Sequence, residues 1–199
     1  MEQKIVNTSN ELFLTYGFKS VTMDDIAEKL GMSKKTIYNY YKTKNDLVRA
    51  CVMDIFNAVS EGIDQICIIG MNPIKELFEV KNFILNHLKS EKSSPLFQLK
   101  KYYPKFFYEL QKKQFEVMSE CVQENLTRGI ERKLYRKEID IDFISRIYFS
   151  GITMIKDIEI FPKGKNNMQE LQTQYLEYHI RAIATKNGIS ELEKMLKNE

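Results

Sequence analysis

The sequence has no tryptophan and only three cysteines, eight glycines, four prolines and two histidines among its 199 residues. So few glycines and prolines exclude a fold with many tight turns and favour long helices. Cys51, Cys67 and Cys121 are odd in number and widely spaced, which indicates neither a disulfide framework nor a zinc site. His87 and His179 lie far apart, with no Cys or carboxylate at ligand spacing. We therefore predict no metal and no cofactor.

Long apolar runs are also absent. The longest, Ile66 to Met71, is far shorter than the ~20 residues that a membrane helix needs, and the polar N-terminus does not resemble a signal peptide. We therefore expect a soluble, cytoplasmic protein that does not bind a membrane. Since the sequence has no nucleophile elbow, phosphate-binding glycine loop or zinc-protease motif, we do not expect an enzyme.

The beginning of the chain has the pattern of a helix-turn-helix unit. Apolar residues recur at helical spacing over Ile5–Tyr16, and Gly17 is expected to end that helix. Thr22 is the predicted N-cap of a second helix, which Gly31 is expected to end. Ser33 is the predicted N-cap of a third helix. A tight turn therefore joins the second helix to the third, as in DNA-binding helix-turn-helix units.

Positive charge gathers in the third helix and just after it. The whole chain has a net charge of +3, but residues 33–49 contain five cations and one acid, a local net charge of +4. The third helix is expected over residues 34 to about 41, with Ile37 and either Tyr40 or Tyr41 facing inward. A lysine-bearing helix that is merely solvated is the alternative. The turn, the caps and the interleaved aromatic residues together favour DNA binding.

Several short motifs stand at fixed spacing between about Ile5 and Val52. They are Glu11-Leu12-Phe13, Gly17-Phe18, Val21-Thr22-Met23-Asp24-Asp25-Ile26-Ala27, Gly31-Met32-Ser33-Lys34, Thr36-Ile37-Tyr38, Tyr40-Tyr41, Lys42-Thr43-Lys44 and Leu47. In these motifs the sequence resembles the tetracycline-repressor (TetR) family of bacterial regulators. The resemblance implies an all-α protein with an N-terminal three-helix helix-turn-helix DNA-binding domain and a helical C-terminal domain for ligand binding and dimerisation. We place the first domain at residues 1–48, with its motif at 22–41, and the second at 49–199.

The third helix would then enter the major groove of DNA. The resemblance implies base-edge contacts from Lys34, Lys35, Thr36, Tyr38 and Tyr40. Asn39 can pair with adenine if its side chain points outward. The chemistry of hydroxyls and a cation near helix starts favours phosphate contacts from Thr22, Ser33, Tyr38 and Lys44. Asp24 stands where the family is sometimes basic, so no base contact is expected there.

The second domain is expected to form a homodimer, because a palindromic site needs a two-fold protein. The resemblance implies that the helices at about 141–160 and 168–185 make this interface. Ser150 and Gly151 would permit close helix approach there. The alternative is that this apolar stripe is only the core of the monomer.

Aromatic residues are dense between Phe97 and Phe115. Apolar walls with a few phenols and thiols are typical of a small-molecule pocket. The candidate pocket residues are Tyr103, Phe107, Phe115, Met118, Cys121 and Tyr148. Ordinary core packing is the alternative for each of them.

The sequence therefore predicts a homodimeric repressor that binds double-stranded operator DNA. A small apolar or amphipathic ligand would release it from a palindromic operator. Two alternatives stay open at this stage: a regulator that needs no ligand, and a helical protein-interaction module without an inducer.

Overall fold

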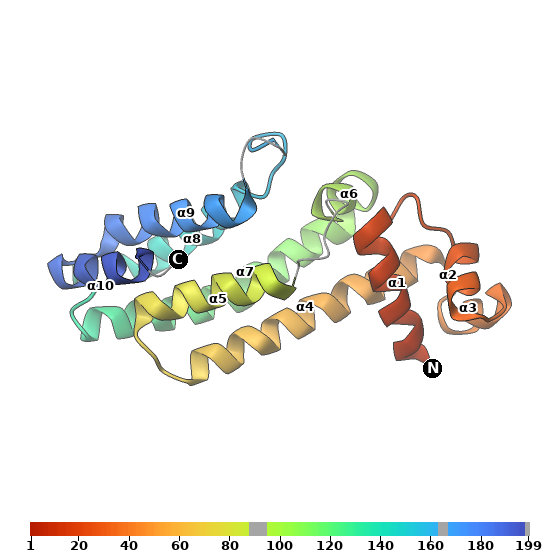
Figure 1. The fold of residues 1–199 in the computed structure, drawn as a ribbon, viewed down its shortest axis with the longest axis horizontal. Coiled ribbons are helices and arrows are strands. Elements are labelled where there is room, and N and C mark those ends of the chain that lie inside the picture. Colours follow the sequence, from red (N-terminus) through yellow and green to blue (C-terminus); the bar gives the residue numbers. More distant parts are fainter. Residues whose placement is uncertain (88–94, 163–166, 198–199) are drawn as a thin grey trace. The chain divides into compact units, whose positions relative to one another are not determined.

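The computed structural model describes residues 1–87, 95–162 and 167–197, and Figure 1 shows the helices that they form. The helices are α1 (Glu2–Tyr16), α2 (Met23–Leu30), α3 (Lys34–Tyr40), α4 (Lys44–Ile68), α5 (Pro73–His87), α6 (Pro95–Tyr102), α7 (Pro104–Glu131), α8 (Ile141–Met154), α9 (Met168–Ile183) and α10 (Lys186–Leu196). In the described residues the β-structure is limited to an isolated bridge between Tyr135 and Ala184. None of these described helices is long and apolar enough to cross a bilayer. The predicted all-α fold is confirmed.

The helices group into two compact units. Unit 1 comprises Met1–Glu61 and His87–Gln111, and unit 2 comprises Gly62–Asn86 and Lys112–Glu199. Because α4 and α7 each contribute residues to both units, the division does not fall at a single point of the chain.

The core of unit 1 is built from the apolar faces of several helices. Ile5, Ile26, Ile37 and Leu47 come from four successive helices, and each is 0% exposed. Gly17 ends α1 at φ 88, and its N–H donates to Phe13 O at 2.8 Å. A Cβ on Gly17 would overlap the side chain of Gln98, so glycine permits both the backbone turn and this contact. The predicted end of the first helix is confirmed.

The core of unit 2 surrounds a buried ion pair. Glu76 of α5 is 1% exposed, and Arg128 of α7 donates to its two carboxylate oxygens at 2.6 and 2.8 Å. The amide of Asn125 donates to the same carboxylate at 2.8 Å, and the Tyr135 hydroxyl donates to Asn125 Oδ1 at 3.2 Å. A buried charge is tolerated when its lone pairs are satisfied in this way.

Tyr135 lies in a segment that sequence patterning indicates only as a charged link. It is nevertheless 1% exposed and packs in the core of unit 2. A Cβ on Gly129 would come within 2.0 Å of the Tyr135 ring, so this glycine makes room for the ring without interrupting α7. Helix α7 therefore continues through Gly129 and ends at Glu131.

The prediction that the helix beginning at Ile141 reaches residue 160 is wrong, because α8 ends at Met154. Beyond that point the N–H groups of Lys156 and Asp157 bond three residues back, to Thr153 O and Met154 O. The Asp157 carboxylate then accepts from Glu159 N at 2.9 Å. Such side-chain bonds to nearby backbone compete with helix continuation.

Gly151 serves packing inside the chain. A Cβ at this position would meet the ring of Tyr175 at 2.2 Å, so the glycine lets α9 approach α8 closely. The Tyr175 hydroxyl lies 2.9 Å from Tyr148 O and 3.1 Å from Ile147 O. This contact lies between two helices of one chain, so the close approach expected at a dimer interface stays a prediction.

His179 gives the stability of unit 2 a pH dependence. It is 4% exposed and packs against Tyr148, with ring centroids 4.9 Å apart. Burial lowers the pKa of His179 from 6.5 to about 4. Between these two values the unfolded chain binds the proton and the folded chain does not, so the free energy of unfolding falls as the pH falls from about 6.5 to 4. The full loss is about 3 kcal/mol.

Replacing His179 by Gln is therefore expected to flatten the fall in unfolding free energy between pH 6.5 and 4. Urea titrations at successive pH values measure the slope of the unfolding free energy against pH. A loss of packing in the variant that is the same at every pH does not change this slope. His87→Gln is the matched control because His87 is exposed. An unchanged slope in His179→Gln would contradict this origin of the pH dependence.

Candidate nucleic-acid interface

Hydrogen bonds at both ends fix the position of α2. The Thr22 hydroxyl accepts from Asp25 N at 3.2 Å and donates to Asp25 Oδ2 at 2.9 Å, while Thr22 N donates to the same oxygen at 2.7 Å. These bonds, the one from Thr22 N foremost, lower the pKa of the Asp25 carboxyl. At the other end Gly31 adopts the left-handed conformation, with φ 64. The predicted capping residues of this helix are confirmed.

A tight turn leads from α2 to α3. Met32 N donates to Ala27 O at 3.0 Å, and the Ser33 hydroxyl accepts from Thr36 N at 3.1 Å. The Ser33 and Thr36 hydroxyl oxygens are also 2.8 Å apart. Both hydroxyls therefore take part in starting α3.

Ile37 anchors α3 to the core of unit 1. It is 0% exposed, and Tyr41, directly after the helix, is 7% exposed. Tyr41 is thus the inward-facing tyrosine, whereas Tyr40 is exposed. The Tyr41 hydroxyl donates to Glu2 Oε1 at 3.3 Å, and burial, aided by Glu2, raises its pKa to about 12.

The remaining side chains of α3 form an exposed face. Thr36 is half-buried; the exposed residues are Lys34, Lys35, Tyr38, Asn39 and Tyr40. Lys35 and Asn39 are one turn apart and lie opposite Ile37 on the helix. This face offers an ammonium group, an amide and phenols, which are the groups that bind base edges and phosphates.

Lys34 has an acidic partner. Its Nζ lies 2.7 Å from Asp24 Oδ2 on α2, and this hydrogen bond raises the pKa of Lys34. A contact from Lys34 to a guanine would therefore replace the bond to Asp24.

A second capping box, which sequence reasoning missed, starts α4. The Thr43 hydroxyl donates to Asp46 Oδ2 at 2.8 Å and accepts from Asp46 N at 3.1 Å. The spacing from Thr43 to Asp46 equals that from Thr22 to Asp25, and this repeat was the available signal.

Lys44 follows this cap and is half-buried. Burial lowers the pKa of Lys44, and the nearby charge of Lys19 lowers it further, while Asp25 opposes the shift. Lys19 is thus a second cation at this corner. Sequence reasoning missed it because it precedes the turn and lies far from Lys44 along the chain.

Arg49 is one of the five cations in residues 33–49, but its side chain binds groups outside that segment. Its Nη2 lies 2.6 Å from Glu109 Oε2, and its guanidinium lies 4.8 Å from the centre of the Phe106 ring. The local charge count therefore overstates the positive charge that this surface presents.

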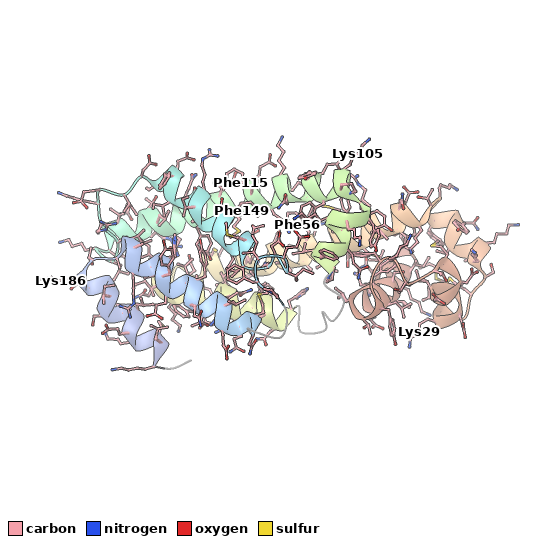
Figure 2. All side chains as sticks on the ribbon, turned by 90° about the horizontal axis from the view of Figure 1, so that it is seen from above. Lys29, Phe56, Lys105, Phe115, Phe149 and Lys186 are labelled. Atoms are coloured by element: carbon pink, nitrogen blue, oxygen red, sulfur yellow. The ribbon has the colours of Figure 1, made fainter. Side chains whose placement is uncertain are left out.

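The candidate pocket residues are divided between the two units. Tyr103 and Phe107 pack against the core of unit 1, and Met118 and Tyr148 belong to the core cluster of unit 2. Figure 2 shows Phe115 next to Phe149, with ring centroids 5.3 Å apart. Cys121 Sγ lies 2.7 Å from Cys67 Sγ. The pocket remains a prediction.

One hollow of about 460 Å³ lies between α1 and α4. Its lining includes Glu2, Gln3, Tyr41 and Asp54, and it contains none of the six candidate pocket residues. Among the residues that the structure describes, no group of His, Cys, Asp and Glu could hold a metal ion.

Comparisons with known proteins agree with this geometry. The family described as bacterial regulatory proteins, tetR family, matches residues 5–51. The chain is 29% identical over 158 residues to the HTH-type transcriptional regulator YvaF of Bacillus subtilis, covering 74% of this chain and 81% of that protein. It is 20% identical over 194 residues to an HTH-type transcriptional repressor of Mycolicibacterium smegmatis, covering 93% and 91%.

The fold is similar over a longer stretch than the family match. The crystal structure of a transcriptional regulator from Cytophaga hutchinsonii gives a TM-score of 0.73 at 19% identity, over 92% of this chain and 98% of that chain. The likeness in fold therefore extends through both units, while the family match ends at residue 51.

Ile37→Ala is expected to destabilise unit 1 by about 2–5 kcal/mol, because it removes buried methyl groups and leaves a cavity. Tyr38→Ala is the matched control on the same helix; since Tyr38 is 36% exposed, we expect a change within about 0.5 kcal/mol. Urea unfolding followed by circular dichroism measures both. Equal losses in the two variants would contradict the anchoring role of Ile37.

Proposed function

The chain belongs to the TetR family of transcriptional regulators, and from this premise we propose that it is a homodimeric repressor of a palindromic DNA operator. Residues 1–48 would bind DNA, and residues 49–199 would provide dimerisation and ligand binding. The observation that carries the proposal is the exposed polar face of α3 opposite the buried Ile37. A protein with this role works where the DNA is, in the cytoplasm, and needs no catalytic group.

In this proposal α3 enters the major groove and reads base edges. Lys35 and Asn39 are best placed to do so, since both lie on the side of the helix opposite Ile37. Asn39 would pair with adenine and Lys35 with guanine. Lys34, Thr36, Tyr38 and Tyr40 flank them and would complete the base contacts.

Phosphate contacts would hold the helix in register. Lys44 is the strongest candidate because Lys19 lies near it, and a phosphate would relieve the repulsion between the two cations. Tyr38 and Ser33 would add hydroxyl contacts. Thr22 would have to release its bond to Asp25 before its hydroxyl could donate to a phosphate.

Exposed apolar side chains on α8 support the homodimer. Phe143, Ile147 and Met154 are 57%, 46% and 49% exposed, and they recur at helical spacing. The opposite face of α8 holds the buried Ser145 and Tyr148. A second copy of the chain, packed through α8 and α9, would cover the apolar face and set two recognition helices ~34 Å apart.

A small ligand bound in the second domain would release the DNA. It would favour a dimer whose recognition helices are spaced differently, and operator affinity would fall by the difference in ligand affinity between the two forms. Helix α4 would transmit the change, since it starts beside α3 and has residues in both units. A regulator without a ligand is the second candidate, favoured by the core packing of Tyr103, Phe107 and Tyr148.

The purified protein is expected to bind the region upstream of its own gene with sequence preference. Electrophoretic mobility shifts with specific and scrambled duplexes test this. Asn39→Ala should reduce the preference for the specific duplex by about 1–3 kcal/mol, because one bidentate base contact is lost. Lys186→Ala, an exposed substitution at the start of α10, should change nothing. Equal affinity of the wild type for both duplexes would refute the function.

Lys44→Ala is expected to weaken binding to all sequences alike. One phosphate contact fewer should lower the slope of log affinity against log salt by about 0.9. Fluorescence anisotropy over a salt series measures the slope, with Lys186→Ala again as the control. A loss confined to the specific duplex would mean that Lys44 reads a base.

Ile147→Glu is expected to convert the dimer to a monomer, because it buries a charge in the apolar interface. Analytical ultracentrifugation measures the mass, and operator binding should weaken as one half-site is lost. Ile68→Glu is the matched control, since Ile68 is 77% exposed at the end of α4. A dimer that survives Ile147→Glu and still binds the operator would place the interface elsewhere.

A further inference from the structure

Two cysteines that are far apart in the sequence meet inside unit 2. Cys67 lies near the end of α4 and Cys121 lies in α7, and their sulfur atoms are 2.7 Å apart. Both residues are half-buried. Cys51 differs from both, because it is 1% exposed and its Sγ lies 3.8 Å from Val6 O.

The two thiols have different surroundings. The S–H of Cys121 can donate to Cys67, and this bond lowers the pKa of Cys67 and raises that of Cys121. Burial and the acids Asp64 and Glu76 oppose the lowering at Cys67, while the positive charge of Arg128 favours it.

Arg128 partly offsets the negative charge of Glu76 at this site. Its Nη2 is committed to Glu76, whereas its buried Nη1 has no hydrogen-bond partner among the described residues. A half-buried cysteine whose sulfur accepts a hydrogen bond from a second thiol has a feature of a reactive thiol.

We propose that Cys67 and Cys121 are a redox site that forms an intramolecular disulfide when a hydroperoxide oxidises it. The sulfur atoms need to approach by only about 0.7 Å to reach disulfide bonding distance. Cys67 is the thiol that the peroxide oxidises, and Cys121 is the thiol that completes the bond.

The chemistry balances with a hydroperoxide as the only oxidant. The Cys67 thiolate attacks one peroxide oxygen, the O–O bond breaks, and the leaving oxygen takes a proton to become water or an alcohol. Cys67 is now a sulfenic acid. Cys121 sulfur attacks Cys67 sulfur, the S–O bond breaks, and hydroxide leaves as water with the Cys121 proton. Two thiols have lost two electrons, and the peroxide has gained them.

The disulfide would also regulate DNA binding, a step that rests on the proposed function. It would tie the end of α4 to α7 with the sulfur atoms closer than in the thiol form. Because α4 begins four residues after α3, a shift of α4 changes the support of the recognition helix. The oxidised dimer would bind the operator about tenfold more weakly.

The test uses the full-length protein treated with hydrogen peroxide and digested without reductant. Mass spectrometry should show one peptide pair joined through Cys67 and Cys121, and dithiothreitol should separate it. The count of free thiols should fall from three to one. In Cys121→Ser, dimedone should trap a sulfenic acid on Cys67, while Cys67→Ser should form neither product.

Cys51→Ser is the matched control and should form the same cross-link as the wild type. Thermal melts of the reduced variants check that each is folded. Cross-links through Cys51, disulfides between chains, or three unchanged thiols would each overturn the redox site.

Mobility shifts of the reduced and oxidised protein separate this inference from the proposed function. If the reduced protein binds no specific DNA, the proposed function fails while the disulfide mapping still tests the redox site. If the reduced protein binds and the cross-linked protein binds equally well, the regulatory role fails. If oxidation weakens operator binding by the wild type tenfold but does not weaken binding by Cys67→Ser, the result supports both the proposed function and the regulatory role of the disulfide.

Discussion

The burial of Ile37 is the constraint on which the DNA-binding surface depends. Helix α3 has seven residues, and a helix this short is not stable in water by itself. Five of its residues are a threonine, an isoleucine, two tyrosines and an asparagine, which each lose about 0.5 kcal/mol of helix propensity relative to alanine. Burying one isoleucine side chain contributes about 1.5–3 kcal/mol, which offsets this loss. The same contact determines which side chains face outward, so the stability of α3 and the composition of its exposed face depend on one residue.

Acidic residues at the helix starts reduce the positive potential that the lysines give this surface. Asp25 and Asp46 occupy the positive ends of α2 and α4, where a phosphate would otherwise bind favourably. Asp24 holds Lys34 in a surface ion pair, which is a weak interaction that DNA can replace. The free protein therefore has less positive potential at this surface than its lysine count indicates.

Local chemistry in the sequence predicts the first three helices because their ends are set by side chains close in sequence. Thr22, Gly31 and Ser33 each act within a few residues of themselves, and the structure has them in the predicted roles. The end of α8 could not be predicted in this way, because Met154 is followed by apolar residues that continue the helical pattern. Tyr135, the pairing of Arg49 with Glu109 and the meeting of Cys67 with Cys121 depend on tertiary contacts between distant segments. For the same reason, the exposed face of α3 was predictable and a pocket was not.

Similarity to known proteins says more about the first 51 residues than about the rest of the chain. The family match stops at residue 51, whereas the fold likeness to the Cytophaga hutchinsonii regulator covers 92% of the chain at 19% identity. Helix packing tolerates many combinations of apolar side chains that fill the same volume, so unit 2 can keep its fold while its chemistry differs. A shared fold therefore says little about the chemistry of unit 2, and any role for unit 2 has to be argued from its own side chains. Cys67 and Cys121 are such side chains, because ordinary core packing requires only their volume and leaves the juxtaposition of two sulfur atoms unexplained.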